Sequence, residues 1–208
     1  AVITNVTREH LDYHKTMGKY RQAKAKLFQM AENAVVNLDM EKPEECLQYE
    51  NKKKIAYSLK DQVADIFAED MELGIENSRF KVGNAEFTLD LIGDFNVENA
   101  LASVGAAMAE GIGLDVCAAA LRKIKGVPGR MESVPNKKGL NIIVDYAVTP
   151  DSLEKLYSLL KKINVNNGKI IAVFGSCGER DRGKRPIMGE IVSKYSDYAI
   201  VTNEDPYG

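Results

Sequence analysis

The residues best suited to chemistry gather in three short polar segments. The first, residues 8–14, contains both histidines of the chain, and His10 and His14 flank Asp12. Imidazole and carboxylate groups together are typical ligands of a divalent cation. The same segment can be read as a solvated polar loop that caps a helix, so the spacing alone leaves both interpretations open.

The second segment, residues 175–186, is rich in glycine and basic residues and lies between an expected strand and an expected helix. Gly178 to Lys184 follow the spacing G-x-x-x-x-G-K, but Arg185 stands where a P-loop needs Ser or Thr to hold magnesium, so we do not expect a P-loop. Backbone N–H groups at a helix N-terminus favour an anion, and arginine suits a carboxylate or phosphate. The alternative is a solvated basic loop partly neutralised by Glu179 and Asp181. The basic side chains concerned are Arg180, Arg182, Lys184 and Arg185.

The third segment, residues 93–100, contains two asparagines three positions apart. On a helix, Asn96 and Asn99 share a face. A carboxamide can both donate to and accept from the edge of an adenine ring. Asparagine at a helix start is also a common cap, so this segment alone does not decide between the two roles.

The elements that must position these segments change character along the chain. Residues 1–6, 34–38 and 54–59 are short and apolar and are expected to be strands. Residues 17–30 indicate an amphipathic helix, 71–91 a β-hairpin or small meander, and 97–124 two helices. The apolar face expected for the first helix consists of Tyr20, Ala23, Leu27 and Met30.

A Gly/Pro-rich segment, residues 126–130, indicates a domain boundary, which we place between residues 127 and 128. Beyond it the pattern predicts strand 140–147, helix 150–163, strand 169–175, helix 186–195 and strand 198–202. This alternation implies an α/β fold with a parallel sheet. Ligands of such sheets collect at the carboxyl ends of the strands, here at Asp145 and at residues 175–185 and 202–207.

Composition narrows the functional classes. The 208 residues carry a net charge of -2, which gives no field to attract nucleic acid or an anionic membrane. No run of about 18 apolar residues occurs, so no bilayer span is expected. Three widely spaced cysteines argue against a disulfide framework and fit a reducing cytosol. Because the chain starts and stops within patterned segments, we expect a piece of a longer protein.

Four stretches taken in order, residues 4–28, 93–103, 126–134 and 144–191, resemble the Mur ligase family, and its tripeptide-forming type most closely. The resemblance implies that residues 1–127 are the C-terminal portion of the central ATPase domain. Residues 128–208 would be an incomplete, Rossmann-like C-terminal domain. The implied activity is cytoplasmic, ATP-dependent addition of the third amino acid to UDP-N-acetylmuramoyl-L-Ala-D-Glu in peptidoglycan synthesis, through an acyl-phosphate.

The resemblance also implies roles for single residues, with ATP and Mg²⁺ as cofactors. His10 matches the histidine that ligates the second magnesium ion. Lys24 matches a lysine that is carbamylated in the family and then holds magnesium, although its position alone suggests an ordinary exposed helix lysine. Asn96 and Asn99 match asparagines that contact adenine.

In the second half of the chain, Arg130 matches an arginine that reaches the ATP phosphates, and Asp145 an acid that binds the ribose. Arg180 matches an arginine that grips the carboxylate of the incoming amino acid. Diaminopimelate enzymes carry Asp-Asn-Pro-Arg near the last strand, whereas this chain has Asp205 in place of Asn and Tyr207 in place of Arg. Loss of the arginine cation and gain of the aspartate anion at these two positions favour L-lysine or another diamino acid over diaminopimelate.

Two further departures limit the resemblance. The sequence has no Gly-Lys-Thr or Gly-Lys-Ser run, so the family's P-loop and UDP-binding domain are expected to precede Ala1, and the chain alone is expected to be inactive. Val148 stands where the family usually has His. The alternatives are a folylpolyglutamate or cyanophycin synthetase, or a non-catalytic nucleotide- or anion-binding module. Open sheet edges would also favour self-association.

Overall fold

The computed structural model describes residues 1–164, 168–178 and 181–203 of the chain. The chain forms two compact units. Unit 1 contains residues 1–6 and 21–145, and unit 2 contains residues 7–20 and 146–208. Helix α2 (Met17–Met30) begins in unit 2 and continues in unit 1.

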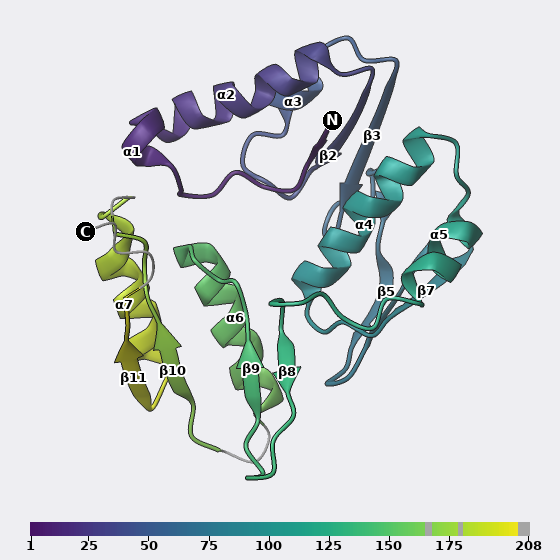
Figure 1. Ribbon diagram of the computed structural model, residues 1–208. Helices are drawn as coiled ribbons and strands as arrows, with labels where there is room; N and C mark the ends of the chain where they lie inside the picture. Colours follow the sequence, from purple (N-terminus) through teal and green to yellow (C-terminus); the bar gives the residue numbers. More distant parts are fainter. Residues whose placement is uncertain (165–167, 179–180, 204–208) are drawn as a thin grey trace. The chain divides into compact units, whose positions relative to one another are not determined.

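Unit 1 is built on a parallel sheet with strand order β1-β2-β3-β4 (Figure 1). Its strands are β1 (Val2–Ile3), β2 (Asn33–Asn37), β3 (Lys53–Ser58) and β4 (Ile66–Phe67). Helix α4 (Asp94–Ala109) packs along β2 and β3. The approach is close at Gly105, where an added Cβ would lie 2.5 Å from Val35 Cγ1, so a residue without a side chain is required.

An antiparallel meander extends the core of unit 1. It consists of β5 (Glu69–Leu73), β6 (Ser78–Val82) and β7 (Ala85–Leu89), as expected from the alternating pattern of this segment. Phe80 and Phe87 stack between neighbouring strands with ring centroids 5.0 Å apart. Helix α5 (Leu114–Leu121) covers β7, and the short helix α3 (Glu44–Leu47) lies against β2. Meander and parallel sheet share one continuous apolar core with α4.

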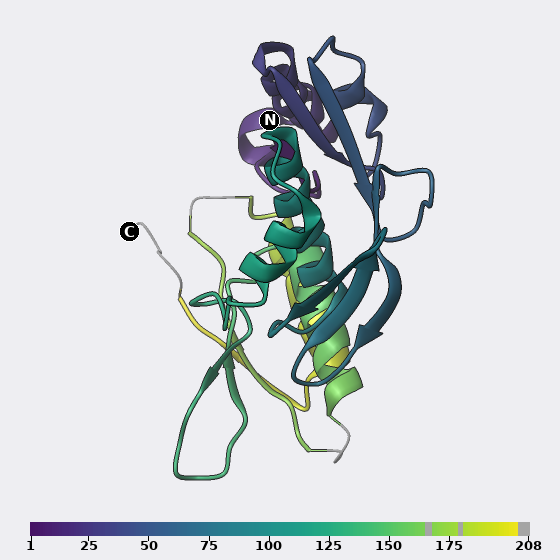
Figure 2. The same cartoon turned by 90° about the vertical axis from the view of Figure 1, so that its right-hand side faces the viewer.

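A two-stranded antiparallel ribbon ends unit 1 and is seen from two sides in Figures 1 and 2. It pairs β8 (Glu132–Val134) with β9 (Ile142–Val144). The strand expected at residues 140–147 therefore exists but is shorter. Strand β8, which the sequence did not reveal, pairs with it in antiparallel orientation.

Unit 2 places two helices on a pair of parallel strands. Its elements are α1 (Leu11–His14), α6 (Pro150–Ile163), β10 (Ile171–Phe174), α7 (Lys184–Tyr195) and β11 (Tyr198–Val201). Thr149 and Ser152 form a reciprocal capping box at the start of α6. The core joins both helices to β10 through Leu153, Tyr157, Ala172, Met188 and Val192.

The bounds expected for α2 agree with the structure, but its expected buried face is only partly right: Tyr20 is buried, whereas the other expected positions are not. Leu27 is 55% exposed and Met30 is 86% exposed. The buried face also contains Arg21, Ala25 and Phe28. On this buried face Arg21 forms ion pairs with Glu41 at 3.2 Å and with Glu45 at 3.5 Å.

None of the helices in the described part of the chain has the length and apolar character needed to cross a bilayer.

Candidate functional site

The β8–β9 ribbon brings Arg130 and Asp145 close together in unit 1. Asp145 directly follows β9, and its Oδ2 accepts a hydrogen bond of 2.8 Å from the backbone N–H of Met131. Arg130 lies one residue before Met131 and is exposed. Met131 has a φ of 48°, so this contact holds the backbone in a conformation that non-glycine residues rarely adopt. Arg130, shortly before β8, and Asp145, directly after β9, therefore place a guanidinium and a carboxylate at the same end of the ribbon.

The two asparagines lie in the first two turns of α4, also in unit 1. Asn96 is half-buried, and its Nδ2 donates to the carbonyl oxygen of Ile92 at 2.8 Å. Asn99 is exposed, and its backbone carbonyl accepts a hydrogen bond from Ser103 Oγ at 3.0 Å. Asn96 therefore has a local partner in addition to any ligand, while the Asn99 side chain faces solvent.

Glu98 lies between these asparagines and carries a charge next to the buried core. Its carboxylate accepts from Asn37 Nδ2 at 2.8 Å. Tyr57 is fully buried nearby, and burial raises the pKa of its phenol, an effect to which Glu98 and Asp39 add. The tyrosine hydroxyl stays neutral and donates to the carbonyl oxygen of Ile3 at 3.2 Å.

The two residues expected at a magnesium site fall in different units. His10, in unit 2, has a φ of 56°, and its Nε2 lies 3.7 Å from Glu9 Oε2. Its ring meets Tyr20 edge-on with centroids 5.8 Å apart. Burial, with a contribution from Glu9, raises the pKa of Tyr20. Lys24, in unit 1, is exposed on α2.

These residues do not by themselves fit a magnesium ion. Within residues 1–164, 168–178 and 181–203, no three His, Cys, Asp or Glu side chains come together as metal ligands would. Magnesium requires nearly octahedral coordination, mostly by oxygen. One imidazole and an unmodified lysine do not provide it.

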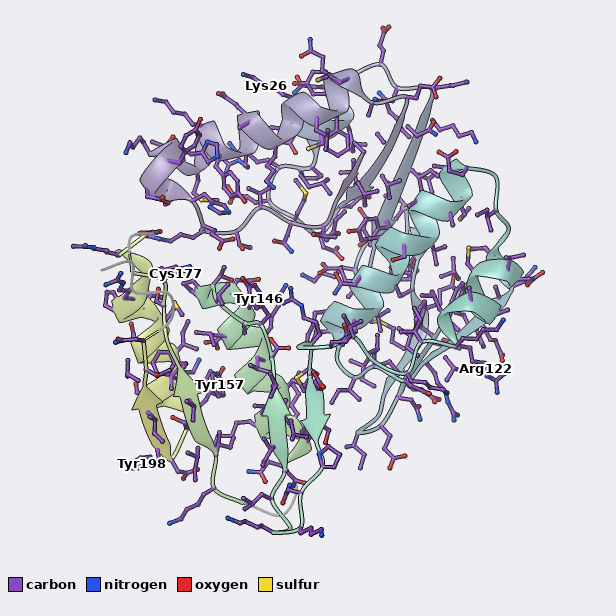
Figure 3. All side chains as sticks on the ribbon, in the orientation of Figure 1. Lys26, Arg122, Tyr146, Tyr157, Cys177 and Tyr198 are labelled. Carbon is purple, nitrogen blue, oxygen red and sulfur yellow. The ribbon has the colours of Figure 1, made fainter. Side chains whose placement is uncertain are left out.

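Unit 2 contains a pocket at the carboxyl ends of β10 and β11, where ligands of parallel sheets collect. Its volume is about 270 Å³. Among the described residues, Ser176 Oγ and Arg185 Nε are buried in this region without a hydrogen-bond partner. Arg185 also donates through Nη2 to the carbonyl oxygens of Cys177, at 3.0 Å, and Gly178. Figure 3 labels Cys177 in the loop after β10. Ser176, Thr202 and Asn203, which lie within the strand-end ranges 175–185 and 202–207 expected to collect ligands, also line the pocket.

The basic loop before α7 is not simply solvated. Lys184 is only 4% exposed, and its Nζ donates to the carbonyl oxygen of Val148 at 2.8 Å and lies 3.9 Å from Glu9 Oε1. Within the same unit, Arg8 Nε lies 3.7 Å from Asp181 Oδ2. Two ion pairs therefore join the loop after β1 to the loop before α7. The expected amino-acid contacts Arg180, Asp205 and Tyr207 lie outside the described residues.

Comparison with known proteins gives matches over nearly the whole chain. Residues 1–107 match the Mur ligase middle domain, and residues 129–208 match the Mur ligase glutamate ligase domain. The chain is 43% identical to a UDP-N-acetylmuramyl-tripeptide synthetase of Roseiflexus sp. (strain RS-1), over 99% of this chain and 44% of that protein.

A second relative has a more specific name. This UDP-N-acetylmuramoyl-L-alanyl-D-glutamate–2,6-diaminopimelate ligase of Syntrophomonas wolfei subsp. wolfei is 39% identical over 99% of this chain and 43% of that protein. A solved structure of a ligase with the same name has a TM-score of 0.63 and 34% identity, covering 98% of this chain and 43% of the other. The chain thus spans less than half the length of the relatives it matches.

Proposed function

This chain belongs to the Mur ligase family, and we propose that it is part of an ATP-dependent ligase that adds the third amino acid to UDP-N-acetylmuramoyl-L-Ala-D-Glu in peptidoglycan synthesis. The carboxylate of the dipeptide attacks the γ-phosphorus of ATP, which releases ADP and forms an acyl-phosphate. The amine of the third amino acid then attacks the acyl carbon. A tetrahedral intermediate expels phosphate, and the amine loses a proton, leaving the amide.

The observation that carries this proposal is the contact between Asp145 and the backbone N–H of Met131, which brings a carboxylate next to Arg130. Arginine pairs with phosphate through two parallel hydrogen bonds. An aspartate accepts hydrogen bonds from the hydroxyl groups of a ribose. We assign Arg130 to the phosphates and Asp145 to the ribose of ATP, with Asn96 and Asn99 on the adenine ring.

We assign the incoming amino acid to the pocket at the ends of β10 and β11. The buried Ser176 Oγ and Arg185 Nε can donate hydrogen bonds to a ligand in this pocket. Arg180, Asp205 and Tyr207 complete the proposed contacts. The proposed substrate is a diamino acid. Residues 204–207 contain two acidic residues and no arginine, which favours L-lysine over diaminopimelate. Because relatives are named as 2,6-diaminopimelate ligases, diaminopimelate is the alternative third amino acid to test against L-lysine.

Magnesium is proposed for the complete reaction, where it would neutralise charge on the phosphates. His10 is the proposed ligand in unit 2. Lys24 is the proposed site of carbamylation in unit 1, as the family resemblance implies; reaction of its neutral amine with carbon dioxide and loss of a proton would give an anionic, carboxylate-like group.

The remaining proposals concern organisation and place. We propose a domain boundary between residues 127 and 128, in the Gly/Pro-rich segment where unit 1 passes from α5 to the β8–β9 ribbon. A nucleotide-linked precursor and ATP are cytoplasmic substrates, so we propose a cytoplasmic location. We propose no nucleic-acid partner, because the net charge is only -2.

The test is a ligation assay on the natural protein that contains this chain, with ATP, the UDP-linked dipeptide and a panel of amino acids. Phosphate release that requires both the dipeptide and one amino acid supports the proposal and identifies the third residue. Arg130→Met should raise the KM for ATP about tenfold or more, because it removes a hydrogen bond to a charged group. Arg122→Met, at the exposed end of α5, is the matched control. Absence of turnover with every amine would refute the proposal.

A further inference from the structure

Strand β2 begins and ends with an asparagine, and both side chains bind glutamates at opposite ends of α4. Asn33 Nδ2 donates to Glu110 Oε1 at 3.1 Å, at the C-terminal cap of the helix. Asn37 Nδ2 donates to Glu98 Oε1 at 2.8 Å, near the N-terminal end. All four residues belong to unit 1, so helix and strand are fastened to each other at two points.

The two asparagines differ in burial and in what else they hold. Asn37 is 1% exposed, and its Nδ2 also donates to the carbonyl oxygen of Thr4 at 2.7 Å. Its Oδ1 accepts from the backbone N–H of Asp39 at 2.9 Å. Asn37 therefore ties the end of β1, the loop after β2 and α4 together. Because both N–H groups of its buried carboxamide have partners, it has no donor left for a ligand.

The bond between Asn37 and Glu98 acts where the proposed adenine contacts lie. Glu98 is between Asn96 and Asn99 in the first two turns of α4. Neighbouring Val97 is fully buried, but the burial of an apolar side chain has no preferred direction and so does not by itself set the rotation of these first turns about the helix axis. A hydrogen bond to a carboxylate is directional and stronger than a neutral one, so it restricts this rotation.

We propose that Asn37 is a positioning residue for nucleotide binding. Through Glu98 it fixes the rotation of the first turns of α4, so that Asn96 and Asn99 face the adenine ring. Asn33 makes the same type of contact at the other end of the helix and has no such role. The inference rests on the proposed function, because it assumes that Asn96 and Asn99 bind the nucleotide.

The experiment compares the same substitution at the two ends of α4 in the natural protein. Asn37→Asp removes the donors and sets a second carboxylate beside Glu98, whereas Asn33→Asp does the same beside Glu110. Steady-state kinetics measure the KM for ATP, the KM for the amino acid and kcat, and urea unfolding measures stability. Asn37→Asp should raise the KM for ATP about tenfold, the factor that corresponds to loss of a hydrogen bond to a charged group. At saturating ATP, kcat and the KM for the amino acid should stay within about twofold.

Two further variants keep the test decisive. Glu98→Gln retains an oxygen that accepts from Asn37, so its KM for ATP should stay close to that of the wild type. If Asn37→Asp does not fold, Glu98→Ala removes the same bond from the partly exposed helix side and should raise the KM for ATP to a similar degree.

The outcomes separate this inference from the proposed function. Wild-type turnover together with an unchanged KM for ATP in folded Asn37→Asp overturns the positioning role alone. An equal rise in Asn33→Asp also overturns it, because the effect would then follow from general loosening of α4. Absence of ATP-dependent ligation by the wild type refutes the proposed function, and the inference with it.

Discussion

Lys184 lies at the first position of α7 with 4% of its surface exposed, and its ammonium donates to the carbonyl oxygen of Val148 at 2.8 Å. Lysine is rarely buried without a partner, because removing its charge from water costs free energy. The contact with Val148, supported by Glu9 at 3.9 Å, offsets part of that cost. The ammonium thus fastens the start of α7 to the loop before α6.

Lys184→Ala should therefore lower the free energy of unfolding by about 2 kcal/mol, because the carbonyl of Val148 loses its donor and the methylene stem leaves a gap. Lys155→Ala is the control, because its ion pair with Asp151 is exposed and should contribute less than about 0.5 kcal/mol. Urea unfolding monitored by circular dichroism measures both values. Equal losses in the two variants would show that the burial of Lys184 has no energetic consequence.

The hydrogen bonds of Glu154 lead to a prediction about the pKa of its carboxyl group. Hydrogen bonds from the Tyr195 hydroxyl and from Lys194 hold the pKa of this carboxyl below its usual value. A lowered folded-state pKa means that the contribution to stability is present above the unfolded-state pKa and is lost as pH falls through the folded-state pKa. Tyr195→Phe removes the larger cause, so the pKa of Glu154 should rise toward its ordinary value.

Carbon-13 NMR titration of the Glu154 carboxyl measures this pKa in the wild type and in Tyr195→Phe. Titration of both proteins under identical conditions isolates the effect of the tyrosine hydroxyl. If the pKa of Glu154 is the same with and without the tyrosine hydroxyl, the attribution to this hydrogen bond is wrong.

At the scale of elements, Gly105 shows how α4 and β2 constrain each other. An alanine favours a helix by about 1 kcal/mol over glycine. Here the added Cβ would lie 2.5 Å from Val35 Cγ1 in a fully buried contact, so the helix would have to move. Gly105→Ala should lower the free energy of unfolding by about 1–3 kcal/mol, because overpacking outweighs helix propensity.

A double-mutant cycle tests this contact directly. Val35→Ala alone leaves a cavity and should also destabilise, but it removes the methyl group that Gly105→Ala would strike. The double variant should therefore be more stable than the sum of the single effects predicts, with a coupling energy of about 1 kcal/mol or more. Strict additivity would mean that α4 accommodates the methyl group elsewhere.

The sequence predicted most elements because periodicity reports which face of an element is apolar. Helix α6 and the β5–β7 meander agree with it closely, since capping residues and turns mark their limits. Strand β8 was missed because Glu132–Val134 is only three residues long and exposed. The buried face of α2 was only partly predicted, because Tyr20 is buried as expected while Leu27 and Met30 are exposed and Arg21 is buried through tertiary ion pairs that periodicity does not report.

The candidate site was likewise predicted only in part from the sequence. The segments that carry it could be found from residue types, and the carboxyl-end rule indicated where the pocket of unit 2 lies. What the sequence could not give is pairing between distant residues. The contact of Asp145 with Met131 and the bonds of Asn37 to Thr4 and Glu98 depend on tertiary structure alone.

At the scale of the whole molecule, the described residues leave one face of the β10–β11 sheet uncovered. Strand pairing sets Ile171 beside Tyr198 and Val173 beside Ile200, and these four side chains are between 44% and 65% exposed. On the opposite face Ala172 is 2% exposed and joins the helix-covered core. Parallel sheets normally have both faces covered. Strand β1 is also the last strand of its sheet, so one of its edges is open.

Exposed apolar area and open strand edges both favour association with another copy. We therefore expect the 208-residue chain to self-associate with rising concentration. Val173→Lys, in the centre of the uncovered face, should shift the equilibrium toward monomer, whereas Leu27→Lys on the exposed side of α2 should have little effect. Sedimentation velocity over a wide concentration range measures the distribution of monomer and larger species.

If Val173→Lys leaves the wild-type association unchanged, the open edge of β1 becomes the contact to test. Val2→Pro tests it, because proline cannot donate a hydrogen bond to a strand across that edge. A chain that stays monomeric throughout would refute self-association altogether.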